Sequence, residues 1–221
     1  MKAVLFDFGG TLDADGLTWL DRFHPLYKEA GLAADRESFA RAFYDSDDAL
    51  ASRHDLRGLS LEETVSLQVD DVLSRLAPQR RASGAAIARR FVEDCRRHLD
   101  RNRPMLRRLK ERYRLGVVSN FYGNLEGLLR REGLLDLFDV VADSAVVGAL
   151  KPEPAIFQHA LGRLGAAASE SLMVGDSVPR DMRGAEGLRM PHALIGPAAG
   201  APCCAAAWRL STLGGLEALL A

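Results

Sequence analysis

The sequence of 221 residues has few cysteines and no long apolar run. Its three cysteines, Cys95, Cys203 and Cys204, are an odd number without metal-binding spacing, which argues against a disulfide framework. A reducing cytoplasm is therefore the expected compartment. No stretch approaches the roughly 18 apolar residues of a membrane span, and the N-terminal apolar run is too short for a secretory signal. We expect a soluble protein without a membrane partner.

The sequence also lacks an excess of either charge, because the formal net charge is −1. A balanced charge gives no global basic surface for nucleic acid, so no nucleic-acid partner is expected. Almost all basic residues are arginine, and lysine occurs only at Lys2, Lys28, Lys110 and Lys151. One isolated lysine among many arginines is a candidate for a specific role, and Lys151 returns below.

Two kinds of pattern divide the chain. Residues 16–100 show helical spacing of apolar side chains and no convincing strand. Within them, Ser60 and Glu63 form a capping box that predicts a helix start, and a further helix is expected over 83–99. We predict that this segment is a separate helical unit. We assign 16–100 to this helical unit, and 1–15 and 101–221 to a core domain.

The rest of the chain alternates short apolar strands with helices. This alternation predicts an α/β fold with a doubly wound parallel sheet covered on both faces, into which the helical unit is inserted after the first strand. The expected strands lie within 1–12 and at 115–118, 140–142, 172–174 and 192–195, and the expected helices at 105–112, 122–132, 153–164 and 179–187. The Ala/Gly/Pro-rich segment 196–207 is expected to be a loop.

Polar residues follow several of these strands. Asp7 ends the first apolar run and is followed by Gly9, Gly10 and Thr11. Ligands bind at the carboxyl ends of strands in such a sheet, where Gly-rich backbone can approach them closely. The other strand ends and helix starts supply Ser119, Asn120, Lys151, Asp176 and Asp181. Converging carboxylates need a cation, and hard oxygen ligands suit Mg²⁺, which often bridges to a phosphate. Phosphoryl transfer is the chemistry that this set predicts.

The four segments together resemble the haloacid dehalogenase-like (HAD) hydrolase superfamily over nearly the whole chain. Residues 7–11 resemble its first motif, Asp-x-Asp-x-Thr, and the apolar run ending at Ser119 resembles its second. Lys151-Pro152 resembles the third motif, and 175–181 resemble the fourth, Gly-Asp-x-x-x-x-Asp. The helical insertion is similar to the C1 cap of the family, which sets substrate choice.

The resemblance implies a role for each matching position. Asp7 would be the nucleophile, forming an aspartyl-phosphate, and would also ligate Mg²⁺ together with the backbone carbonyl of Gly9 and with Asp176. Asp181 would ligate through water or orient Lys151. Ser119 and Lys151 would bind the transferring group, and Thr11 would fix the turn. The backbone amides of Phe8, Gly9 and Asn120 would cradle its oxygens. The implied activity is a Mg²⁺-dependent phosphatase acting on a small phosphorylated metabolite.

Gly9 departs from the family pattern, because phosphatases of the family carry a general acid/base aspartate there. Such help is typically worth about 10²–10⁴-fold in rate. A surrogate acid such as Asp13 or Asp15 could replace it. Alternatively, the chain resembles a metal-independent 2-haloacid dehalogenase, whose halide leaving group needs no proton. A phosphonatase would need an imine-forming cap lysine, for which only Lys28 is available, and a non-catalytic binding protein is the third alternative.

The cap sequence identifies substrate contacts less clearly than the core. Its plausible contacts are Trp19, Arg22, His24, Tyr44, Arg53 and His54, none of which the sequence favours individually.

Overall fold

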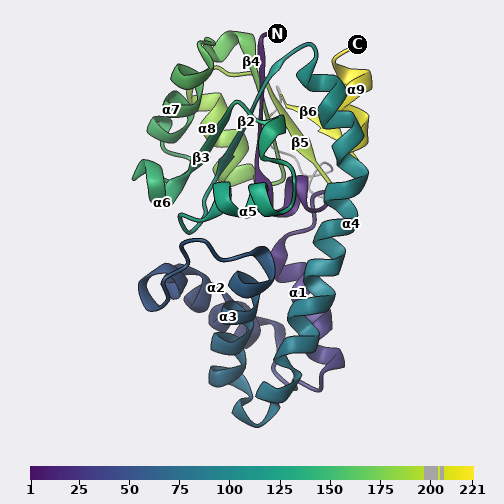
Figure 1. The fold of residues 1–221 in the computed structure, drawn as a ribbon, viewed down its shortest axis with the longest axis vertical. Helices are drawn as coiled ribbons and strands as arrows, with labels where there is room; N and C mark the ends of the chain where they lie inside the picture. The colour runs from purple at the N-terminus through teal and green to yellow at the C-terminus, as the bar shows by residue number, and fades with distance from the viewer. Residues whose placement is uncertain (197–203, 205–206) are drawn as a thin grey trace.

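A parallel sheet forms the centre of the core in this computed structural model, which describes residues 1–196, 204 and 207–221 (Figure 1). Within those residues the sheet has six strands in the order β3-β2-β1-β4-β5-β6, and every neighbouring pair is parallel. The strands are β1 Ala3–Phe6, β2 Arg114–Ser119, β3 Val140–Asp143, β4 Ser171–Gly175, β5 His192–Ile195 and β6 Trp208–Leu210. The predicted α/β fold class is confirmed.

Both faces of the sheet are buried, as β1 illustrates. Its side chains alternate between two apolar clusters, with Val4 and Phe6 in one and Ala3 and Leu5 in the other. The first cluster includes residues of α4 Gly84–Lys110, α5 Leu125–Arg131 and α9 Leu216–Leu219. The second includes residues of α7 Pro154–Leu164 and α8 Arg183–Gly187, and the short α6 Ser144–Val147 packs against it. Helices on both faces explain why the strands read as apolar runs.

A helical lobe, which we call the cap below, lies beside the carboxyl end of the sheet. It contains α1 Trp19–Glu29, α2 Arg36–Arg53, α3 Leu61–Leu76 and the N-terminal part of α4 (Figure 1). The capping box is present at the start of α3, where Ser60 and Glu63 bond each other's backbone. Because α4 runs without a break through residue 100, the division into 1–15, 101–221 and 16–100 stays a prediction.

The two helices predicted at 83–99 and 105–112 are wrong as separate elements. They form the single helix α4, which contains Pro104. A proline inside a helix removes one hydrogen bond and usually breaks it. Here Met105, Leu106 and Leu109 continue the buried face of the helix onto the core, and this packing maintains it.

Smaller differences lie near the C-terminus. The helix expected over 179–187 is a tight turn, Val178–Met182, followed by α8. The strand β6 was not predicted, because it has three residues and two of them, Trp208 and Arg209, are exposed. Most of the predicted loop 196–207, including Cys203, lies outside the described residues. None of the described helices is long and apolar enough to cross a membrane.

Candidate active site

The strand order brings the predicted polar residues to one place. From β1 the chain proceeds to β2 and β3 on one side, and it returns to place β4 on the other side of β1. The carboxyl ends of β1 and β4 are therefore at the switch point of the sheet, where ligands of this fold class bind. Asp7 follows β1 and Asp176 follows β4, while Ser119 ends β2.

Asp7 is held through one of its two oxygens. Oδ1 accepts hydrogen bonds from the Phe8 amide and from the Ser119 hydroxyl, each at 2.7 Å. Lys151 Nζ lies 2.8 Å from the same oxygen. Among the described residues, Oδ2 has no protein partner. The carboxylate is thus fixed in orientation while one oxygen stays available to a ligand.

Lys151 is buried with its charge compensated. Its ammonium also lies 2.6 Å from Asp181 Oδ1, and both side chains are at most 1% exposed. Burial disfavours the charged form, but the carboxylates of Asp181 and Asp7 outweigh this cost and raise the pKa of Lys151. The lysine therefore remains a cation at neutral pH. Asn120 positions its backbone, since the amide side chain accepts from Lys151 N and donates to Lys151 O.

Asp7, Asp176 and Asp181 form a carboxylate cluster that could hold a metal. One oxygen of each lies within 4.8 Å of the others. Burial, reinforced by the charges of Asp7 and Asp181, raises the pKa of Asp176 to about 8. Burial likewise raises the pKa of Asp181, against the attraction of Lys151. Three converging carboxylates facing one lysine leave excess negative charge, so the donor set fits a hard divalent cation such as Mg²⁺.

Gly10 and Thr11 shape the turn around this cluster. Gly10 has a φ of +85°, and a Cβ there would lie 2.6 Å from Asp176 Oδ2. Only glycine fits such a conformation beside the carboxylate. The Thr11 hydroxyl donates to Asp176 Oδ1 at 3.0 Å. The turn after β1 therefore depends on the same carboxylate as the candidate metal site.

Gly9 lies under the indole of Trp19. A Cβ at Gly9 would be 3.2 Å from Trp19 Nε1, a tight contact. The indole in turn donates to Asp13 Oδ2 at 2.7 Å. The space beside position 9, where the family's phosphatases carry an aspartate, is thus closed on one side by a cap tryptophan.

The suggested surrogate acids are not available, which corrects the sequence interpretation. Asp13 is fully buried and accepts from Gly10 N at 2.6 Å, from Trp19 and from Arg22. Asp15 accepts from Leu213 N and Arg101. Neither carboxylate lines the cavity described below.

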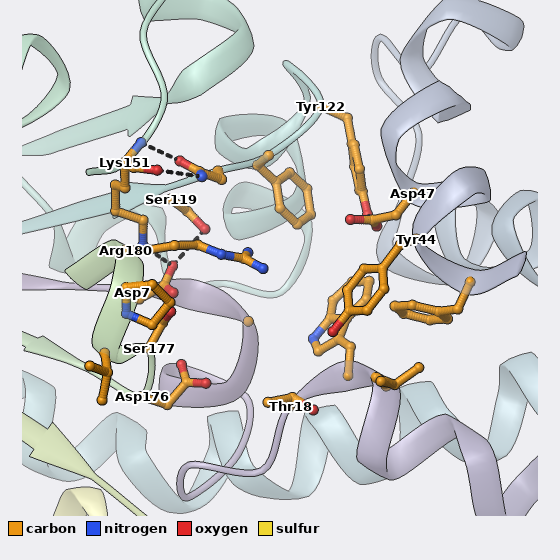
Figure 2. A pocket seen from close by; sticks show the side chains of 18 residues that line it. Asp7, Thr18, Tyr44, Asp47, Ser119, Tyr122, Lys151, Asp176, Ser177 and Arg180 are labelled. Atoms are coloured by element: carbon orange, nitrogen blue, oxygen red, sulfur yellow. Dashed lines mark hydrogen bonds and ion pairs between the residues drawn. The ribbon is translucent and has the colours of Figure 1, made fainter. Parts of the chain in front are cut away.

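A cavity of about 360 Å³ connects the carboxylate cluster to the cap. Figure 2 shows Asp7, Ser119 and Asp176 on one side of it and Tyr44, Asp47 and Tyr122 on the other. Of the plausible cap contacts, Trp19 and Tyr44 line the cavity, whereas Arg22, His24, Arg53 and His54 do not. Lys28 is exposed on α1 and is also absent from the lining, so the structure does not support an imine-forming lysine.

Sequence reasoning missed five polar residues that line the cavity, namely Thr18, Asp47, Tyr122, Ser177 and Arg180. One signal existed for Asp47, because it follows Phe39 and Phe43 at helical spacing and is thus an acid on an apolar face of α2. No sequence signal separated Arg180 from the many surface arginines.

The fold and site define an α/β protein with a parallel sheet and a carboxylate cluster at the switch point of that sheet, and comparison with known proteins identifies the family. The family model for haloacid dehalogenase-like hydrolases matches residues 1–188, and the chain belongs to this family. The resemblance stated from the motifs is therefore confirmed.

Particular relatives share the family. A glyceraldehyde 3-phosphate phosphatase from Methanothermobacter thermautotrophicus is 31% identical over 88% of this chain and 85% of its own. The chain is also similar to a crystal structure of a HAD phosphatase from Thermococcus onnurineus, with a TM-score of 0.57 and 28% identity over 100% and 98% of the two chains.

Another relative matches over a shorter segment. Haloacid dehalogenase-like hydrolase domain-containing protein 3 from Danio rerio is 48% identical over 30% of this chain. That match spans 27% of the relative's length, and the matches to its mouse and bovine counterparts span 34%.

Proposed function

We propose that this hydrolase is a Mg²⁺-dependent phosphatase that acts on a small phosphorylated metabolite through an aspartyl-phosphate on Asp7. The observation that carries the proposal is the cluster of Asp7, Asp176 and Asp181, whose oxygens converge within 4.8 Å. The relative aligned over most of this chain is named a phosphatase, which supports the same activity. When bound, Mg²⁺ would be held by Asp7, Asp176 and the carbonyl of Gly9, with Asp181 contributing through water or orienting Lys151, and it would neutralise phosphoryl charge.

The protein residues have complementary tasks in this proposal. The fixed orientation of Asp7 directs its free Oδ2 at phosphorus, so that a bond to Asp7 forms as the bond to the leaving oxygen breaks. Ser119 and the cationic Lys151 bind the phosphoryl oxygens, assisted by the backbone amides of Phe8, Gly9 and Asn120. Water then hydrolyses the aspartyl-phosphate, releasing phosphate and regenerating the carboxylate.

Proton transfer is the step for which this site is poorly equipped. Gly9 has no side chain to protonate the leaving oxygen, and Asp13 is bound by other partners. Water in the cavity is the proton source in our proposal. Transition-state stabilisation by charge and positioning does not depend on that proton, so we expect turnover to be slowed and not abolished.

The test is phosphate release from p-nitrophenyl phosphate and from a panel of phosphorylated metabolites, with Mg²⁺ and with EDTA. We expect Mg²⁺-dependent release that falls by at least about 10³-fold in Asp7→Asn, which removes the nucleophile. The control is Asp100→Asn, which changes an exposed carboxylate on α4 that is absent from the cavity lining.

The alternatives predict different outcomes. Gly9 favours a dehalogenase, because a halide needs no proton, and that activity would release halide from a 2-haloacid without metal. Release of halide and of no phosphate would replace our proposal. Release of neither would favour the non-catalytic alternative.

A further inference from the structure

The end of the cavity that faces the cap carries polar groups that the proposed phosphoryl chemistry does not use. Asp47 from α2 and Tyr122 from the loop after β2 lie across the cavity from Asp7 and Ser119, and the Arg180 side chain reaches between the two sides (Figure 2). We call Asp47, Tyr122 and Arg180 the cap subsite.

Asp47 is fixed through one oxygen in the same way as Asp7. Its Oδ1 accepts from the Tyr122 hydroxyl and, at 3.1 Å, from Nε2 of Gln68, a residue that is 1% exposed. Burial raises the pKa of Tyr122, so this hydroxyl keeps its proton and remains a donor. Among the described residues, Oδ2 of Asp47 has no partner. The subsite thus holds a positioned acceptor beside the cavity.

Arg180 supplies donors on the opposite side. It is exposed, lines the cavity and makes no hydrogen bond or ion pair with another side chain in the described part of the protein. Burial raises the pKa of Asp47, and the hydrogen bond from Tyr122 and the nearby positive charge of Arg180 oppose this rise. A guanidinium with five N–H donors can bind a hydroxyl, carbonyl or anionic oxygen.

The combination of acceptor and cation restricts the ligand. An ammonium group would bind Asp47 but be repelled by Arg180, and a second anionic group would bind Arg180 but be repelled by Asp47. A neutral group that both donates and accepts satisfies the two together, and a hydroxyl does so. The cavity volume is at the low end of the range for ligand sites and must also hold the phosphoryl group, which favours a small leaving group.

We propose that the cap subsite binds a hydroxyl group of the leaving part of the substrate, and that the substrate class is therefore small polyhydroxy phosphate esters, such as phosphates of polyols and short sugars. In this arrangement a substrate hydroxyl donates to Asp47 Oδ2, and Arg180 donates to an oxygen of the same part. The inference rests on the proposed phosphatase function and deepens it.

Two esters with the same three-carbon chain test this directly. Glycerol 3-phosphate has two hydroxyls and n-propyl phosphate has none. A hydrogen bond to a charged group corresponds to about tenfold or more in binding, so we expect wild type to favour glycerol 3-phosphate in kcat/KM by at least about tenfold. Asp47→Asn keeps an oxygen for Tyr122 and Gln68 but replaces the open oxygen by a donor. It should reduce that ratio about tenfold, mainly through KM.

The matched control is Asp48→Asn. Asp48 is the next residue of α2, is exposed and is absent from the cavity lining, so the same change of charge should leave the ratio within about twofold. Arg180→Met, which keeps the length of the side chain and removes its donors, should reduce the ratio in the same direction as Asp47→Asn. Thermal unfolding of each variant verifies that it is folded.

The outcomes separate this inference from the proposed function. If wild type releases phosphate neither from these esters nor from p-nitrophenyl phosphate, the phosphatase proposal fails and this inference fails with it. If phosphate is released but the ratio is the same in wild type, Asp47→Asn and Arg180→Met, the cap subsite alone is refuted. A preference for uridine 5′-monophosphate over glycerol 3-phosphate that survives both substitutions would also refute it. That result would assign a base to the aromatic side chains that line the cavity, which include Trp19, Phe43 and Phe121.

Discussion

Gly9 and Trp19 together determine what the proposed nucleophile, Asp7, lacks. Gly9 provides no acid, and a Cβ atom added at Gly9 would lie 3.2 Å from the indole Nε1 of Trp19. The indole is fixed by its hydrogen bond to Asp13, so it cannot easily move aside for a larger residue. The residue pair thus excludes the usual proton donor of the family's phosphatases, with a measurable consequence for leaving groups.

We predict that the phosphorylation step depends strongly on the acidity of the leaving group. p-Nitrophenol leaves as a stable anion, whereas phenol benefits from a proton that position 9 does not supply. In single-turnover experiments, p-nitrophenyl phosphate should react at least about tenfold faster than phenyl phosphate. Similar rates for the two esters would mean that some other group donates the proton, and would contradict the role that we give to Gly9.

The raised pKa of Asp176 leads us to predict how Mg²⁺ binding depends on pH. Its pKa rises from an ordinary value of 3.8 to about 8, chiefly through burial and then through the charges of Asp7 and Asp181. Below about pH 8 the metal-free site therefore holds a proton that a cation must displace. Mg²⁺ affinity should rise up to about tenfold per pH unit between pH 6 and 8 and level off above. Calorimetric titration at several pH values measures this.

The same pKa shift lowers the stability of the metal-free protein as the pH rises, whereas the affinity for Mg²⁺ rises with pH. A carboxyl group whose folded pKa is raised favours folding at low pH, and that contribution is lost as pH rises from about 3.8 to about 8. We expect Mg²⁺ to restore the melting temperature most strongly near pH 8 and above. Asp176→Asn should remove both effects, and a pH-independent Mg²⁺ affinity in wild type would contradict them.

At the scale of elements, α1 is attached to the turn after β1 by a buried ion pair. Arg22 Nη1 on α1 lies 2.9 Å from Asp13 Oδ2, with the two side chains 6% and 0% exposed. Arg22 also pairs with Asp94 on α4, at 2.9 Å. One arginine therefore joins α1, the long helix α4 and the turn that follows β1.

We predict that Arg22→Met lowers the free energy of unfolding by about 3 kcal/mol, because it leaves the buried Asp13 without its cation. Urea denaturation, with m compared between variants, measures this. Arg89→Met is the control, since Arg89 is exposed and its pair with Glu93 should contribute less than about 1 kcal/mol. An equal loss of unfolding free energy in the two variants would show that the buried ion pair stabilises the protein no more than the exposed pair does.

On the scale of the whole molecule, α4 couples the cap to the core. It begins in the helical lobe and ends beside the sheet, and one apolar cluster extends from the sheet to the cap helices (Figure 1). A continuous helix and a shared core favour cooperative unfolding.

The two tryptophans can test this cooperativity. Trp19 lies on α1 in the cap and Trp208 on β6 in the core. In Trp208→Phe, the fluorescence of Trp19 should report the same urea midpoint as far-UV circular dichroism, which follows all helices. A fluorescence transition at lower urea would instead show that the cap unfolds independently.

The sequence alone predicted the strands that deliver Asp7, Ser119 and Asp176, because buried parallel strands read as short apolar runs and polar residues at their ends are conspicuous. The order of the four motifs also predicted the family, which the family match confirms. These features are local: each depends on a few consecutive residues whose pattern is visible in one dimension.

Tertiary structure decided what depends on long-range packing. Pro104 lies inside one helix because side chains beyond it pack on the core, which no local rule could indicate. Asp13 is unavailable as an acid because Arg22 and Trp19 bind it, and Asp47 faces the cavity because α2 packs on α3 and meets Tyr122. Such contacts join segments that are separated in the chain, and only folding determines which polar side chains they satisfy and which remain open to a ligand.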